Sequence, residues 1–269
     1  MSMGERIGLL SFLIAVLLLF FAVELAVIPL VGFILLCIAA PFFPRFSFFL
    51  PIISRGTSGK KAVALTFDDG PDPLSTPVLL RLLLKHQIKA TFFVTGKNTA
   101  EHPELIKEIL HYGHSIGNHS YTHNNLLMFR SSKFIAREIE SAQNVLNNFG
   151  VIPLAFRPPV GITGPRLRPA LLKTGMYTVN FSCRGPDAGN RWIKGLSKKI
   201  LRRIRPEDII ALHDVRPHNP LLFASWIDEI ELILSGIKDK GIEVLPLGEI
   251  IGRPVMKTEI DGMKPNLDF

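Results

Sequence analysis

Short apolar runs alternate with amphipathic stretches of helical spacing along most of this 269-residue chain. Apolar runs at residues 63–67 and 91–94 predict buried strands, and residues 76–86 between them carry apolar side chains at helical spacing. Strands joined by crossovers of this length run parallel. The pattern therefore predicts an α/β fold, with a (β/α) barrel of eight or fewer units as its leading form.

The pattern continues to the end of the chain. Further strands are expected at residues 115–118, 155–157, 177–181, 208–212 and 243–245. Further helices are expected at residues 103–111, 134–149, 168–174, 194–205 and 224–238.

The N-terminal region is strongly apolar, and Glu24 is the only charged residue from position 7 to position 43. As one helix it would be ~55 Å long, against a bilayer core of ~30 Å. A single span with an interfacial segment fits this length, and so does a hairpin of two short helices that turns near Glu24, Pro29 and Gly32. The stretch is too long for a cleavable signal peptide. We therefore expect a membrane anchor.

Composition divides the chain into four segments. These are an anchor at residues 1–44, a linker with Pro, Gly and Ser at 45–61, a folded domain at 62–252 and a C-terminal tail at 253–269. The formal net charge of +8 suggests an anionic neighbour. With an anchor present, we expect lipid headgroups rather than nucleic acid to be that neighbour.

Two acidic residues, Asp68 and Asp69, follow the first predicted strand. A turn at Gly70–Pro71 would let both carboxylates face one pocket, where one could bind a metal and the other accept a proton from water. A helix N-cap followed by a turn explains the same residues equally well.

Two histidines, His119 and His123, lie four residues apart, a spacing that puts both on one face of a helical turn. With Asp69 they would form a metal site of two histidines and one carboxylate that leaves positions open for water and substrate. Histidines with this spacing also occur on ordinary surfaces.

Two further groups follow strands. Arg157 precedes two prolines that fix its loop, so it can pair with Asp68, although an ordinary turn would look the same. His213 follows Leu212 and could protonate a leaving amine, or could be a core histidine.

The carboxyl ends of barrel strands converge on one face, so all four clusters should meet there.

Four motifs now occur in a recognisable order: Thr-Phe-Asp-Asp-Gly at 66–70, His-Ser-x-x-His at 119–123, Arg-Pro-Pro-x-Gly at 157–161 and Leu-His-Asp at 212–214. This order resembles the polysaccharide deacetylase family (NodB homology, carbohydrate esterase family 4) over residues 60–252. The resemblance implies a distorted (β/α) barrel of the NodB type. It also implies a hydrolase that removes an N-acyl group, expected to be acetyl, from an amino sugar of a cell-surface or lipid-linked glycan.

The resemblance also assigns roles to residues. The implied metal ligands are Asp69, His119 and His123, with zinc as the expected ion. The implied acid–base groups are Asp68 as base, Arg157 as its partner and His213 as general acid. The implied substrate contacts are Pro159, Val160, Trp192, Ala211 and Leu212, with the Val160 backbone N–H helping to stabilise the oxyanion.

The sequence departs from the family pattern at two places. Asp187 stands where an aspartate would orient His213, but Arg191 precedes Trp192 where the family often has Asp. Ala211 replaces the Leu that often lines the acyl pocket two residues before the acid histidine, which suggests room for a different acyl group.

Two alternatives remain. One is a deformylase or deacylase of an undecaprenyl-linked amino sugar at the cytoplasmic face, and the other is a non-catalytic, membrane-anchored glycan-binding protein. Most family members favour an extracytoplasmic domain at the cell membrane. The basic residues flanking the apolar stretch favour the cytoplasm instead, with Arg6 before it and Arg45, Arg55, Lys60 and Lys61 after it.

One basic segment stands apart from these motifs. Residues 194–205 hold six cations and no acid. They form either a solvated helix face or a surface for anionic headgroups or a substrate's pyrophosphate.

Overall fold

The computed structural model describes residues 1–258. Its parallel sheet consists of β1 (Ile52–Ile53), β2 (Ala62–Asp68), β3 (Thr91–Val94), β4 (Ser115–Asn118), β6 (Ala155–Phe156), β7 (Tyr177–Val179), β8 (Cys183–Arg184), β9 (Ile209–His213) and β10 (Glu243–Val244). Around it lie α3 (Ser75–Lys85), α4 (Gly96–Glu101), α5 (Pro103–His111), α6 (Ser132–Asn147), α7 (Leu167–Thr174), α8 (Leu196–Arg203), α9 (Phe223–Asp239) and α10 (Leu247–Ile251).

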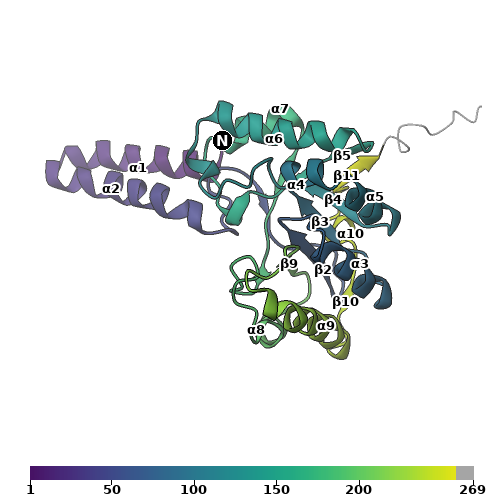
Figure 1. Cartoon of the computed structure of the whole chain (residues 1–269). Helices are drawn as coiled ribbons and strands as arrows, with labels where there is room; N and C mark the ends of the chain where they lie inside the picture. Colours follow the sequence, from purple (N-terminus) through teal and green to yellow (C-terminus); the bar gives the residue numbers. More distant parts are fainter. Residues whose placement is uncertain (259–269) are drawn as a thin grey trace, which may run out of the picture.

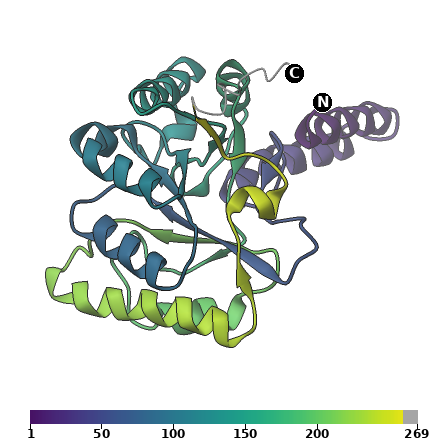
Figure 2. The same ribbon diagram turned by 90° about the vertical axis from the view of Figure 1, so that its right-hand side faces the viewer.

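The sheet is curled and its strands run in the order β1-β7-β6-β4-β3-β2-β9-β8, with β10 added beside β2. Helices cover its outer face, as two perpendicular views show (Figures 1 and 2). The predicted α/β fold with parallel strands is thereby confirmed, and its form is a distorted barrel with β1 and β8 at the two ends of the strand order.

The two faces of β2 differ in side-chain size. Val63, Leu65 and Phe67 point outward and pack under α3, α5, α8 and α9 in a large apolar cluster. Ala62 and Ala64 point inward, because successive side chains of a strand alternate between faces. The apolar side chains of β2 are therefore small on the inner face and large on the outer face.

The inner face leads directly to the candidate site. Strands β2 and β9 are paired so that Thr66 lies opposite Ala211 and Asp68 lies opposite His213. All four residues are therefore on the inward-pointing side of their strands. The polar pair stands at the carboxyl edge, above the apolar layer.

Two segments that composition marked as linker and tail contribute strands. Within residues 45–61, β1 pairs with β7, and Phe48 and Leu50 just before it are buried. Within residues 253–269, β11 (Met256–Thr258) pairs antiparallel with β5 (Val151–Pro153). The strands are only two and three residues long, which is too short for a recognisable strand pattern in the sequence. The rest of the tail lies outside the described residues.

The apolar N-terminal region forms a helical hairpin that projects from the domain (Figure 1). Helices α1 (Met3–Leu19) and α2 (Val23–Ala39) pack together, with Gly8 against the Phe33 ring. Of the two arrangements that fitted the length, the structure has the hairpin. The connection lies at residues 20–22, before the expected position, and Pro29 lies inside α2. Residues 23–42 are long and apolar enough to cross a bilayer.

We expect Ala211→Leu to lower the free energy of unfolding by about 1–3 kcal/mol, because Ala211 is only 1% exposed within the inner apolar layer. Chemical denaturation measures the change. Ala100→Leu, at an exposed position of α4, is the matched control and should change stability little. Equal stability of the two variants would contradict tight packing around Ala211.

Candidate active site

A cleft of about 460 Å³ opens at the carboxyl edge of the central strands. Six of the residues singled out from the sequence line it: Asp68, Asp69, His119, His123, Val160 and His213. Elements far apart in the sequence supply them, as expected for a site at the strand ends of a barrel.

The two acidic residues share the cleft because the chain turns between them. Asp68 ends β2, and Asp69 has a left-handed backbone with φ of 76°. Gly70 makes this turn possible, since a Cβ there would lie 2.3 Å from Oδ2 of buried Asp214. The Asn98 side-chain amide donates a hydrogen bond of 2.8 Å to the Asp69 carbonyl and fixes the turn.

The two histidines approach each other in a loop after β4, with ring centroids 4.8 Å apart. The expected helical turn is absent from this described segment. Ser120 and His123 instead have φ values of 66° and 53°. The Ser120 hydroxyl accepts a hydrogen bond of 3.2 Å from the His123 backbone N–H. Left-handed residues thus bring the pair together where a helix was expected.

Three ligand atoms from Asp69, His119 and His123 lie within 4.8 Å of one another. Asp69 Oδ1 is 3.2 Å from His119 Nε2 and 3.0 Å from His123 Nε2, and it is buried without a hydrogen-bond partner. The Arg157 carbonyl lies 2.7 Å from His119 Nδ1 and can accept its proton, which leaves the Nε2 lone pair facing the carboxylate.

The electrostatics of these three residues suit a cation. Burial, together with neighbouring His119, lowers the pKa of His123 to about 4, so its imidazole is neutral at pH 7. Burial opposes ionisation of Asp69, but the two imidazoles hold its pKa below its usual range. The neutral His123 imidazole, the ionised Asp69 carboxylate and its unsatisfied oxygen fit a divalent metal ion.

Arg157 is fully buried beneath the cleft. Its Nη1 donates to Asp68 Oδ1 at 2.6 Å and to Thr66 Oγ1 at 2.7 Å. Its guanidinium lies 4.0 Å from the centroid of the Phe93 ring. Burial lowers the pKa of Arg157, and Asp68 opposes that shift. The structure therefore brings the predicted pair together as a buried ion pair.

His213 and Asp187 also form a pair, with 2.7 Å between Nδ1 and Oδ2. Burial alone would disfavour the imidazolium, but Asp187, with Asp69 and Asp68, outweighs it and raises the pKa of His213 to about 9. The histidine is therefore protonated at neutral pH and can donate from Nε2.

The remaining predicted contacts lie at different depths. Val160 has a left-handed φ of 53° and is 40% exposed on the cleft wall, whereas Pro159 beside it is buried. Ala211 lies in the inner apolar layer and Leu212 in the outer one, so neither lines the cleft. Trp192 is 67% exposed and also lies outside the cleft lining.

Sequence reasoning missed several residues that complete the site. Phe181, Arg184 and Asn125 line the cleft. Asn190 Nδ2 donates to the His213 and Val215 carbonyls at 3.1 and 2.6 Å and so holds the backbone of the acid histidine. Phe181 ends the strand predicted at residues 177–181 and Arg184 lies three residues after it, and this position was the available signal. Asn125 and Asn190 lie in loops without such a signal.

The chain is similar to known deacetylases in both sequence and structure. The polysaccharide deacetylase family profile matches residues 55–179. A chitooligosaccharide deacetylase from a Bradyrhizobium species is 30% identical over 202 residues, which cover 72% of this chain and 92% of that protein. A peptidoglycan-N-acetylglucosamine deacetylase from Bacillus cereus is 34% identical over 194 residues, covering 71% of this chain and 69% of that protein. A solved peptidoglycan N-acetylglucosamine deacetylase superposes with a TM-score of 0.67 and 30% identity, covering 76% and 94% of the two chains.

We expect the full chain to bind about one divalent ion, and His119→Ala, His123→Ala and Asp69→Asn each to lose most of it. Metal analysis of dialysed protein measures this. His111→Ala, at an exposed position of α5, is the control and should retain the ion. Full occupancy in all three cleft variants would exclude this site.

Proposed function

The chain belongs to the polysaccharide deacetylase family, and we propose from its site that it is a metal-dependent N-deacetylase of a glycan containing N-acetylglucosamine. One observation carries the proposal. A single cleft holds a metal-ligand group from the turn after β2 and the loop after β4, a base candidate at Asp68, and an acid candidate at His213 on β9.

The substrate class follows from the relatives. Their names give chitooligosaccharide and peptidoglycan N-acetylglucosamine as the compounds they act on. Both contain N-acetylated glucosamine, so this sugar is the substrate that we propose here. A binding protein without catalysis would have no need of both an acid and a base in one cleft.

The base is positioned by its ion pair. Arg157 occupies Oδ1 of Asp68, so Oδ2 is the oxygen that can take a proton from the attacking water. Asp69, His119 and His123 would hold the metal, proposed as zinc. A divalent ion bound there polarises the acyl carbonyl and lowers the pKa of water. The Val160 backbone N–H is the proposed additional donor to the developing oxyanion.

The acid completes the reaction. Water adds to the acyl carbon, the carbon–nitrogen bond breaks, and His213 donates its Nε2 proton to the departing sugar nitrogen. The products are acetate and a free amino sugar. Asp187 holds the Nδ1 proton and stabilises the imidazolium before this transfer.

The hairpin supports a proposal about location. Large apolar side chains on α1 and α2 are exposed along both helices, among them Leu9, Phe12, Leu17, Ile28 and Leu35. An exposed apolar surface of this extent needs an apolar environment. We propose that the hairpin inserts into the cell membrane, and the side on which the domain lies stays a prediction.

We expect Asp68→Asn to keep its metal but lose deacetylase activity, and His213→Ala to lower kcat ~10²-fold or more. Acetate release from N-acetylglucosamine oligomers measures both. Asp68→Asn also leaves Arg157 buried without its counter-ion, which should lower stability by about 3–5 kcal/mol. Activity is therefore normalised to the folded fraction. Near-normal turnover by either folded variant would contradict the assigned roles.

The pH dependence tests the acid separately. Because the pKa of His213 is raised to about 9, its donating form is lost as the pH rises through that value. We expect kcat to fall on the alkaline side, with an apparent pKa at or below about 9, since a bound cation favours the neutral imidazole. Asp187→Asn should move this limb to lower pH by about one unit or more. Asp239→Asn, at an exposed position of α9, should not. An unmoved alkaline limb in Asp187→Asn would refute the pairing.

A further inference from the structure

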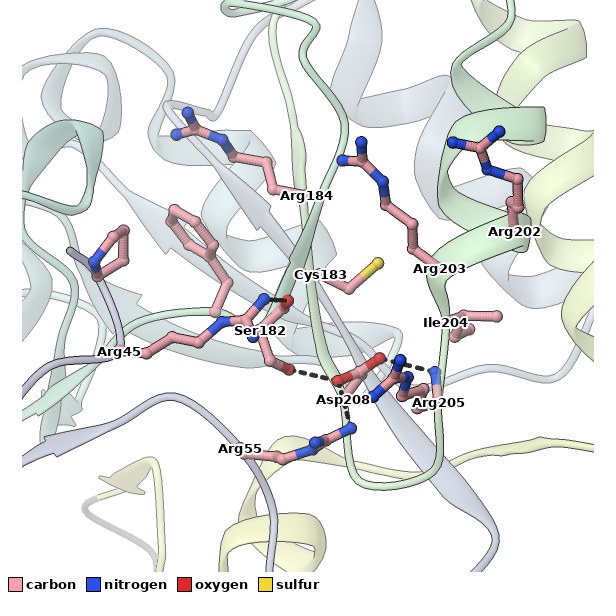
Figure 3. Close-up of a pocket in the computed structure, with 12 residues that line it drawn as sticks. Arg45, Arg55, Ser182, Cys183, Arg184, Arg202, Arg203, Ile204, Arg205 and Asp208 are labelled. Carbon is pink, nitrogen blue, oxygen red and sulfur yellow. Dashed lines mark hydrogen bonds and ion pairs between the residues drawn. The ribbon is translucent and has the colours of Figure 1, made fainter. Parts of the chain in front are cut away.

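A second cavity, of about 520 Å³, lies next to the catalytic cleft. Arginines dominate its lining: Arg45, Arg55, Arg184, Arg202, Arg203 and Arg205 (Figure 3). They come from both ends of the sheet order, with Arg45 before β1, Arg55 after it and Arg184 in β8. The other three lie at the end of α8 or just after it. This set is called the arginine pocket below.

The arginine pocket carries more positive than negative charge. Asp208 is the one acidic residue in its lining, and it is held by Arg55 at 3.0 Å and by the Ser182 hydroxyl at 2.8 Å. In the part of the chain that the structure describes, no acidic side chain forms an ion pair with Arg184, Arg202 or Arg203. These three extend away from Asp208 (Figure 3). Guanidinium groups that form no ion pair with an acidic side chain are suited to a phosphate, which they can bind in a bidentate manner.

The arginine pocket also connects two different environments. Phe181 and Arg184 line both this pocket and the catalytic cleft. Arg45 also lines an apolar cavity of about 460 Å³ at the base of the hairpin, which is otherwise lined by Leu36, Ala40, Phe43 and Phe46. The arginine pocket therefore adjoins both the apolar cavity and the catalytic cleft.

A ligand that fills this series has three parts in the same order. An acyl-bearing sugar would occupy the cleft, a phosphate or diphosphate the arginine pocket, and a hydrocarbon chain the apolar cavity. We propose that the arginine pocket binds the phosphate of a lipid-linked amino sugar and so presents that sugar to the catalytic cleft. This inference rests on the proposed function, because it identifies the form in which the sugar arrives.

A phospholipid headgroup carries the same phosphate chemistry but would bind without regard to the catalytic cleft. Cations on any membrane-facing surface would bind such a headgroup equally well. Lys198 and Lys199 are exposed on the same helix as Arg202 and Arg203, but they do not line the pocket. They therefore provide a control with matched charge and matched helix.

The experiment uses the full chain in nanodiscs of zwitterionic phosphatidylcholine. Deacetylation is measured on N-acetylglucosamine linked to farnesyl diphosphate and on a soluble N-acetylglucosamine oligomer. For Arg202→Ala/Arg203→Ala we expect the ratio of kcat/KM for the lipid-linked over the soluble substrate to fall ~10-fold or more. Lys198→Ala/Lys199→Ala should keep the wild-type ratio. An unchanged ratio in the arginine variant, or an equal fall in the lysine variant, would overturn the proposal.

A binding measurement separates this inference from the proposed function. Farnesyl diphosphate, which has no acyl group, should bind the wild-type chain and the lysine variant by calorimetry, and should bind the arginine variant ~10-fold or more weakly. Displacement by phosphatidylglycerol or inorganic phosphate at equal concentration would overturn the proposal in favour of a headgroup or free-phosphate site. Absence of deacetylation with both substrates would refute the proposed function. Equal binding of farnesyl diphosphate by the wild-type chain and the arginine variant would refute the role of the arginine pocket.

Discussion

The buried guanidinium of Arg157 is the interaction on which the site depends. A charge without solvent contact is tolerated only when it is paired and hydrogen-bonded, and Arg157 meets this requirement through Asp68, Thr66 and the carbonyls of Val179 and Asn180. Its own carbonyl accepts from His119. One residue thus aligns the base with a metal ligand, and its planar fork explains why lysine would be a poor substitute.

The sequence could predict which residues meet, because strand ends converge in a parallel barrel. The clusters at Asp68, His119, Arg157 and His213 each followed a predicted strand, and the structure places all four within or directly beneath one cleft. Strands β2, β3 and β9 could be recognised in the sequence because they are buried on both faces and are nearly continuous in apolar residues. The parallel arrangement of the strands then brings their carboxyl ends to one edge of the sheet.

Backbone conformation and depth could not be predicted in the same way. Asp69, Ser120, His123 and Val160 all have positive φ, a conformation rare for residues with a Cβ and imposed here by tertiary contacts such as that of Asn98. Whether an inward-pointing residue such as Ala211 reaches the cleft or ends in the layer below depends on barrel curvature. A sequence pattern of period two indicates on which face of the sheet a side chain lies, but not how far along the barrel axis it lies.

The hairpin and the catalytic machinery are linked by a short series of hydrogen bonds. Asn180 Nδ2 donates to the carbonyls of Pro44, just after the hairpin, and Gly161, beside the cleft, at 2.9 and 3.1 Å. The Asn180 carbonyl accepts from Arg157 at 3.2 Å. The segment just after the hairpin is therefore hydrogen-bonded to the domain beside the cleft. With the hairpin in a bilayer, this contact would keep the cleft close to the membrane surface, which suits a substrate that is itself held at that surface.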